Sequence, residues 1–190
     1  TSSCAEGSVS WLYYAFRLVQ LPIGIFGVAL SIAILPVLAR QAAKKSFIEM
    51  KETMVTSLTM VFALCVPATA GLIILSEPII RVIYERGAFT PADTLATAQT
   101  LSLYAVGLFA YSANKILVPA FYALDKTRFP VIASFISVGL NIVFIKLTIE
   151  HFQHLAIALS TSFTMLFNFL FLIIVLYRSL HGFAIKKLFI

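Results

Sequence analysis

Two basic side chains lie in stretches of this sequence that are otherwise almost entirely apolar. Arg17 belongs to a run from Trp11 to Ala39, and Lys115 belongs to a second run further along the chain. An arginine at the centre of a membrane helix costs about 2.5–3.5 kcal/mol on insertion scales, so it faces protein or water rather than lipid. Arginine also binds phosphate oxygens through paired hydrogen bonds. The two cations therefore predict a cavity for an anionic head group, for which a diphosphate offers many acceptors.

Arg17 shares one face of its helix with other polar or small residues. At about 100° per residue, the positions on its side are Ser10, Tyr13, Tyr14, Gln20 and Gly24. We expect Arg17 and Lys115, with Ser10, Tyr13 and Gln20, to contact the substrate. The alternative is structural: each cation could pair with a carboxylate outside this sequence, because none of the eight acidic residues here lies deep in an apolar span.

A second polar pattern lies near the end of the chain. It consists of Ser134, Ser137 and Asn141, and of Thr161, Thr164 and Asn168 at the same spacing. Oxygen atoms on two facing helices could bind Na⁺, with Asn141 and Thr161 as the candidate ligands. The favoured interpretation is hydrogen bonding between helices, worth about 0.6 kcal/mol for each bond in a membrane. Apart from this possible Na⁺, the sequence predicts no cofactor.

The composition is that of an integral membrane protein. The chain has 190 residues, of which 61% are hydrophobic and 12% charged, and its mean hydropathy is +0.99. A soluble domain carries about 25% charged residues. The net charge of +6 comes from residues between apolar spans rather than on one basic face, which argues against nucleic acid as a partner. The first residues do not resemble a signal peptide, and we expect the chain to start inside a longer protein.

The apolar runs predict an all-α polytopic fold with about five membrane spans. These are residues 9–38, 53–76, 91–124, 130–147 and 155–177, with interfacial connectors at 40–52 and 77–90. Pro22 predicts a bend just after Arg17, and Pro119 frees the carbonyl of Lys115 from its helical hydrogen bond. Thr90, Pro91 and Asp93 predict a helix N-cap, a first-turn proline and a capping acid.

The loop charges predict the orientation in the membrane. Nine lysines and arginines belong to the 40–52 connector, the Asp125 loop and the C-terminal tail, whereas three lie in the connectors of the other side. By the positive-inside rule, the nine face the cytoplasm, so the N-terminal end and the Arg86–Thr90 loop face outward.

Three ordered blocks of this sequence are familiar together. The first is GSVSWLYYA at 7–15, followed by Arg17-Leu18, Leu21-Pro22, Gly24, 26–30 and 34–36. The second is RGAFT at 86–90 with Asp93, and the third consists of Lys115, Leu117, Pro119, 121–123, Asp125 and Pro130. These blocks resemble the MurJ/MviN lipid II flippases. The resemblance implies the multidrug/oligosaccharidyl-lipid/polysaccharide exporter superfamily fold, which has two six-helix bundles around a central cavity. The whole chain, 1–190, would be a fragment of the second, C-terminal bundle, from helix eight to helix twelve.

The resemblance also implies a function. The family's arginine at the position of Arg17 lines the cavity for the diphosphate and sugar-peptide head of lipid II. The expected protein is a multi-pass flippase of the bacterial cytoplasmic membrane, not an enzyme. It would move the undecaprenyl-diphosphate-linked peptidoglycan precursor by alternating access. Its partners would be that lipid, the surrounding membrane lipids and the N-terminal bundle of the same protein.

Two positions depart from the family pattern. Phe16 stands where the family has an acidic residue, and Gln20 stands where it often has glutamate. The alternative functions are a drug or oligosaccharide-lipid exporter of the same superfamily and a membrane scaffold that transports nothing. Further arginines within the membrane in the preceding half of the protein would favour the flippase, and carboxylates there would favour a cation-coupled exporter.

Overall fold

The computed structural model describes residues 7–152 and 154–180, and its regular structure in that part is helical throughout. The order of the elements along the chain is simple. It is α1 (Ser8–Pro22), the π-helix η1 (Ile23–Val28), α2 (Ala29–Ala43), α3 (Phe47–Ile74), α4 (Ser76–Tyr84), α5 (Pro91–Val106), α6 (Leu108–Ala123), α7 (Arg128–Phe152) and α8 (His154–Ser179).

Four helical segments are long and apolar enough to cross a membrane. They are Ser8–Ala43, Phe47–Ile74, Arg128–Ile149 and His154–Ser179. Helices α5 and α6 together form a fifth, broken span that bends by 43°. The predicted all-α fold with about five spans is therefore confirmed. Only three residues separate α2 from α3, so most of the 40–52 segment is helical.

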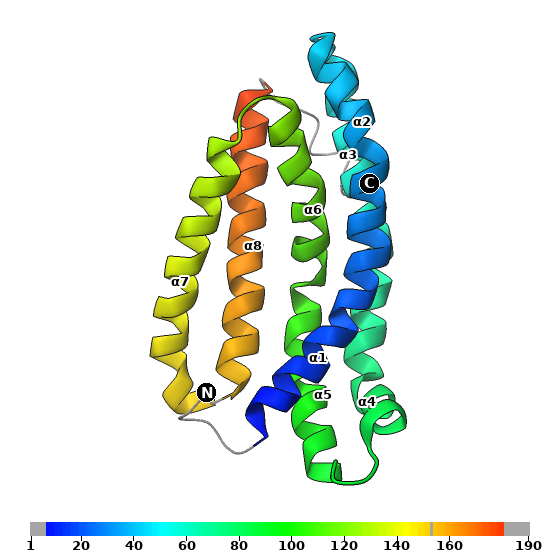
Figure 1. The fold of residues 1–190 in the computed structure, drawn as a ribbon, viewed down its shortest axis with the longest axis vertical. Helices are drawn as coiled ribbons and strands as arrows, with labels where there is room; N and C mark the ends of the chain where they lie inside the picture. The colour runs from blue at the N-terminus through cyan, green and yellow to red at the C-terminus, as the bar shows by residue number, and fades with distance from the viewer. Residues whose placement is uncertain (1–6, 153, 181–190) are drawn as a thin grey trace.

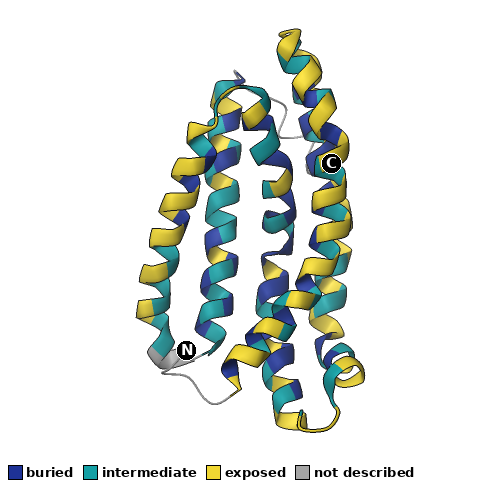
Figure 2. Ribbon diagram, viewed as in Figure 1, coloured by how far each residue is buried: buried dark blue, intermediate teal, exposed yellow. Residues whose placement is uncertain are grey.

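The helices form an elongated bundle with α6 at its centre (Figure 1). Helix α6 packs against α8 on one side and against α2 and α3 on the other, while α7 contacts mainly α8 at the edge of the bundle. The buried side chains gather on these contact faces (Figure 2), and Leu108, Ile116, Leu117 and Phe121 of α6 are fully buried. Helix α7 is the least covered, since only 11% of its most apolar window is buried.

The connectors lie at two opposite ends of this bundle (Figure 1). One end, here called the outer end, holds the start of α1, the α3–α4–α5 connections and the α7–α8 connection. The opposite, inner end holds the α2–α3 and α6–α7 connections and the end of α8. The basic connectors of the described residues therefore lie at the inner end and the less basic ones at the outer end, as the charge count predicts.

Helices approach closely where a glycine removes a side chain. A Cβ atom on Gly27 would lie 3.0 Å from the Cα atom of Ser112, and one on Gly107 would lie 2.9 Å from the Oγ of Ser162. In both places an irregular part of one span packs against a neighbouring helix. These parts are η1, which packs against α6, and the α5–α6 bend, which packs against α8. Gly27 thus lets α6 approach closely, whereas nothing lies within 4 Å of a Cβ at Gly24.

Proline-induced irregularities occur where they were expected. The π-helix η1 follows Pro22 directly, and such one-turn insertions relieve a broken hydrogen-bond ladder. Pro119 cannot donate to the carbonyl of Lys115, and the hydroxyl of Ser31 donates to that carbonyl instead at 2.6 Å. A side chain of α2 therefore satisfies a backbone acceptor that α6 itself leaves open, as the lipid environment demands.

Replacing Ser31 with alanine will leave the Lys115 carbonyl without this donor. We expect a cost of about 0.5–1.5 kcal/mol, the usual net contribution of one hydrogen bond, because the Lys115 carbonyl loses the donor that replaces its missing helical bond. The melting temperature of the purified full-length protein measures it. Ser102→Ala is the matched control, since the Ser102 hydroxyl donates to the Ala98 carbonyl within its own helix. Equal melting temperatures for the two variants would contradict the role of Ser31.

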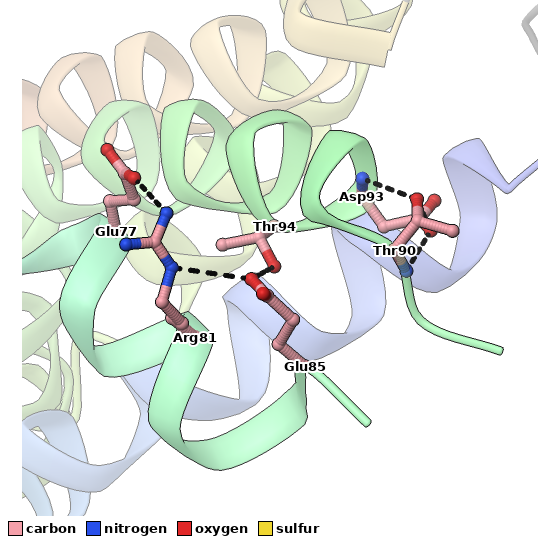
Figure 3. Close-up of polar contacts among 6 residues, drawn as sticks. All are labelled: Glu77, Arg81, Glu85, Thr90, Asp93 and Thr94. Carbon is pink, nitrogen blue, oxygen red and sulfur yellow. Dashed lines mark hydrogen bonds and ion pairs between the residues drawn. The ribbon is translucent and has the colours of Figure 1, made fainter. Parts of the chain in front are cut away.

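The connector at the outer end is held by a network of polar contacts (Figure 3). Arg81 pairs with Glu77 at 2.7 Å and with Glu85 at 3.4 Å, and Glu85 accepts a hydrogen bond from the Thr94 hydroxyl at 2.7 Å. These contacts join α4 to the first turns of α5. The carboxylates of Glu77 and Glu85 are therefore occupied by Arg81.

Helix α5 begins with the predicted cap. The Thr90 amide donates to the Asp93 carboxylate at 2.8 Å, and the Asp93 amide donates to the Thr90 hydroxyl oxygen at 3.4 Å (Figure 3). This reciprocal pair is a capping box with Pro91 at the first helical position. It fixes Asp93 next to α1, where the indole Nε1 of Trp11 donates to its carboxylate at 2.8 Å.

Candidate functional site

The polar stripe of α1 faces away from the bundle. Its members Ser10, Tyr13, Arg17 and Gln20, with Gly24 in the adjoining η1, are all exposed. The opposite face of α1 buries Leu12, Ala15 and Val19 against the other helices. Helix α1 therefore presents an uncovered polar stripe, hereafter the α1 stripe, from the outer end to the middle of the membrane-spanning part (Figure 2).

Arg17 is held by Tyr13, one turn before it. Its Nη1 donates to the Tyr13 hydroxyl at 2.7 Å, and its guanidinium carbon lies 5.8 Å from the centre of the Tyr13 ring. A guanidinium offers five N–H donors, so this contact orients the group and leaves donors for a ligand. Within the described part of the chain, no carboxylate forms an ion pair with Arg17. The positive charge of the α1 stripe is thus not neutralised by those residues.

The structure explains why an aromatic residue stands at position 16. Its ring packs edge-on against Tyr104 at 5.4 Å and Tyr111 at 6.1 Å between centroids. Tyr104 is almost fully buried, at 5% exposure, and its partners here are aromatic. Phe16 therefore points away from the α1 stripe into an apolar layer between α1, α5 and α6, which suits an aromatic ring better than a charge.

Tyr14 also leaves the predicted face. It is half-buried and packs against Tyr84 at 4.6 Å and Phe89 at 5.9 Å between centroids. Its ring contacts the connector between α4 and α5 rather than Arg17. At about 100° per residue, Tyr14 lies at the edge of the stripe. At such a position, the neighbouring helices decide to which side the ring turns.

Lys115 lies at a different depth from Arg17. It is exposed on α6, and its backbone carbonyl is bonded to Ser31, which follows Arg17 by fourteen residues. A helical rise of about 1.5 Å per residue separates the levels of Arg17 and Ser31 by about 20 Å. Lys115 is therefore closer to the inner end, and the structure does not bring the two cations together around one small ligand.

The polar residues of α7 and α8 join these two helices. The Asn141 side-chain amide donates to the Ser160 hydroxyl at 2.7 Å and approaches the Thr164 hydroxyl at 3.5 Å. Asn168 donates to Ser137 at 2.9 Å. The predicted hydrogen bonding between helices is confirmed at these positions. Ser160 was missed, because the register between two helices cannot be read from the spacing within each.

The candidate Na⁺ ligands take different partners. Asn141 contacts α8 through Ser160 and Thr164, whereas the Thr161 hydroxyl donates to the Ile157 carbonyl of its own helix at 2.6 Å. The side-chain groups gathered around Asn141 are neutral hydroxyls, which are hard oxygen donors of the kind that Na⁺ accepts. Among the described residues, no group of three or more His, Cys, Asp or Glu could hold a metal ion. The Na⁺ site stays a prediction.

Comparisons with known proteins agree on one family. The family model described as "Lipid II flippase MurJ" matches residues 1–190. A protein of Buchnera aphidicola named "Probable lipid II flippase MurJ" is 39% identical over 173 residues, which are 91% of this chain and 34% of that protein. One of Vibrio cholerae with the same name is 35% identical over 92% of this chain and 33% of its own length.

A solved structure shows the same fold. "Lipid II flippase MurJ, inward closed conformation" superposes with a TM-score of 0.81 at 33% sequence identity, covering 97% of this chain and 38% of that one. The chain thus spans about a third of the length of the relatives that it matches.

Proposed function

Because this chain belongs to the MurJ lipid II flippase family, we propose that it forms one wall of a path that moves lipid II across the bacterial cytoplasmic membrane. The lipid would be the undecaprenyl-diphosphate-linked peptidoglycan precursor, carried from the inner to the outer leaflet for cell-wall synthesis. No covalent bond would be made or broken, so the protein would act as a transporter rather than an enzyme.

One observation carries this proposal. The α1 stripe is exposed along its whole length, and Arg17 at its centre has no carboxylate partner among the described residues. A cation at membrane depth is unfavourable in lipid, so this face requires a water-filled cavity or a second protein surface. The remaining two thirds of the protein, including the N-terminal bundle, would supply the opposite wall. An anionic head group would then supply the missing negative charge.

The two cations suggest two stages of transport. Arg17 would hold the diphosphate near the middle of the membrane, with Tyr13 fixing its guanidinium and Ser10 and Gln20 bonding the sugars. Lys115 lies about 20 Å nearer the inner end by helical rise, and it would receive the head group from the cytoplasmic side. The two bundles would rock about this path and open it to each side in turn.

Reconstitution tests this function. The full-length protein in proteoliposomes should expose lipid II in the opposite leaflet faster than protein-free liposomes do. A drug or oligosaccharide-lipid exporter of the same superfamily would instead move its own substrate and leave lipid II in place. A scaffold would move neither. Absence of lipid II movement by folded full-length protein would refute the proposal.

A Na⁺ site at Asn141 and Thr161 would couple this transport to an ion gradient. We expect Na⁺ to raise the melting temperature of the parent full-length protein. Asn141→Ala should abolish that increase, because the amide oxygen would be a ligand. Asn168→Ala is the matched control, since it removes the other asparagine that bridges α7 and α8. Equal stabilisation of parent and Asn141→Ala by Na⁺ would eliminate the site.

A further inference from the structure

Two hollows lie one above the other along α1, and they share a residue. The first is a cleft of about 690 Å³ at the outer end, between the start of α1 and the α4–α5 connector. The second is a groove of about 490 Å³ further into the membrane-spanning part, between α1, α3 and α4. Ile83 of α4 lines both, so the two hollows adjoin at this side chain, and together they are hereafter called the outer groove.

The mouth of the outer groove is aromatic and polar. Rings of Trp11, Tyr14, Tyr84 and Phe89 line it, together with Arg86 and Asp93. Tyr14, Tyr84 and Phe89 contact one another with centroids 4.6 to 6.2 Å apart, so they form a preassembled cluster. Aromatic surface with a few fixed polar groups is the usual lining of a small-molecule site, and this volume is in the usual range of about 300–1,000 Å³.

The polar groups of the mouth are fixed in place. The Asp93 carboxylate accepts hydrogen bonds from Trp11 and from the amide and hydroxyl of Thr90. The Arg86 guanidinium donates to the Ile83 carbonyl, which ties it to the end of α4. One carboxylate and one guanidinium beside aromatic rings provide both acceptors and donors for hydroxyl groups, as a sugar ring requires. The guanidinium also suits a phosphate.

The floor of the outer groove has the opposite chemistry. Its lining residues are apolar or glycine: Leu18, Leu21, Pro22, Ile25, Phe26, Ala68, Gly71, Leu72, Leu75, Ile79 and Ile83. Leu21 and Ile25 are 60% and 58% exposed, so their apolar side chains are not covered by the described residues. A polar mouth at the outer end above an apolar floor matches an amphiphile whose head lies at the outer membrane surface and whose tail lies in the membrane.

The position of the outer groove connects it with the transport path. Ser10 belongs both to the α1 stripe and to the mouth, and Leu18 and Leu21 of the floor lie next to and one turn after Arg17. The same helix, α1, therefore carries Arg17 and lines the outer groove, so a lipid that leaves Arg17 toward the outer end would reach the groove along α1. We propose that the outer groove is an exit site, which binds the sugar-bearing polyprenyl diphosphate in the outer leaflet. This inference rests on the proposed function and names its product-side site.

Binding to full-length protein in phosphatidylcholine nanodiscs tests the exit site. The probe is a polyprenyl-diphosphate-linked disaccharide, and all variants are made in an Arg17→Ala background to remove the central site. Saturable binding should persist, and Leu21→Trp should weaken it about tenfold or more by filling the floor. Ile32→Trp is the matched control, because Ile32 is 68% exposed on α2 and lines neither hollow. Equal affinity of these two variants would overturn the proposal.

A second pair of variants tests the mouth. Arg86→Gln should weaken binding of the disaccharide lipid more than binding of the corresponding polyprenol, which lacks the diphosphate and the sugars. Lys146→Gln, which removes an exposed cation outside the groove, should weaken neither.

Displacement of the probe by an equal concentration of phosphatidylglycerol would show an ordinary phospholipid site and overturn the proposal. Lipid II flipping by parent protein without groove binding would refute only the exit site, whereas groove binding without flipping would refute the proposed function.

Discussion

Replacing Arg17 with alanine in the full-length protein will reduce lipid II flipping about 100-fold. Removing one partner of a desolvated, hydrogen-bonded charge pair costs about 2–5 kcal/mol, and 1.4 kcal/mol is tenfold. Arg17 is the only cation of the α1 stripe, and its sole hydrogen-bond partner among the described residues is the Tyr13 hydroxyl. The measurement is the exposure of lipid II in the outer leaflet at matched expression.

Two further variants separate charge from geometry. Arg17→Lys keeps the charge but loses the planar fork, so it should retain part of the activity. Arg40→Ala is the matched control, because Arg40 is an exposed arginine at the inner end whose Nε donates to the Pro36 carbonyl. Its flipping rate should equal that of the parent. Undiminished flipping by Arg17→Ala would remove Arg17 from the transport path.

The largest effect on stability is expected at Gly27. A Cβ atom there would lie 3.0 Å from the backbone Cα of Ser112, so Gly27→Ala forces η1 and α6 apart rather than moving a flexible side chain. Overpacking of this kind costs about 1–3 kcal/mol. The displacement would also stretch the hydrogen bond from Ser31 to the Lys115 carbonyl, one helical turn further along. We expect a clearly lower melting temperature of the purified full-length protein.

Gly139→Ala is the matched control for this prediction. Nothing lies within 4 Å of a Cβ atom at Gly139, which is exposed on α7. Alanine is also the better helix former, so this variant should melt no lower than the parent. A Gly27→Ala protein as stable as Gly139→Ala would show that η1 and α6 can separate without cost.

Features that depend on one helix at a time were predictable from the sequence. The apolar lengths predicted the spans, the 100° rule predicted most of the α1 stripe, and Thr90, Pro91 and Asp93 predicted a capping box that the structure confirms. Pro119 predicted an open carbonyl at Lys115. These inferences succeed because helical geometry and hydrogen-bond requirements in lipid are local rules.

Features that depend on the register between helices were not predictable. Ser160 is the partner of Asn141, and Ser162 of α8 packs against Gly107 at the bend between α5 and α6. The outer groove requires α1 to lie beside a connector that follows it by about seventy residues in the sequence. Each of these contacts is set by packing across the bundle, which no spacing within one segment encodes.

Photo-cross-linking from the α1 stripe tests the central claim most directly. A photoreactive side chain at Gln20, one turn from Arg17, should form an adduct with lipid II in the full-length protein, and Arg17→Ala should remove that adduct. The same group at Leu147, which is 72% exposed on α7, should form none beyond background. Equal adducts at the two positions, or an adduct at Gln20 that does not depend on Arg17, would contradict the account.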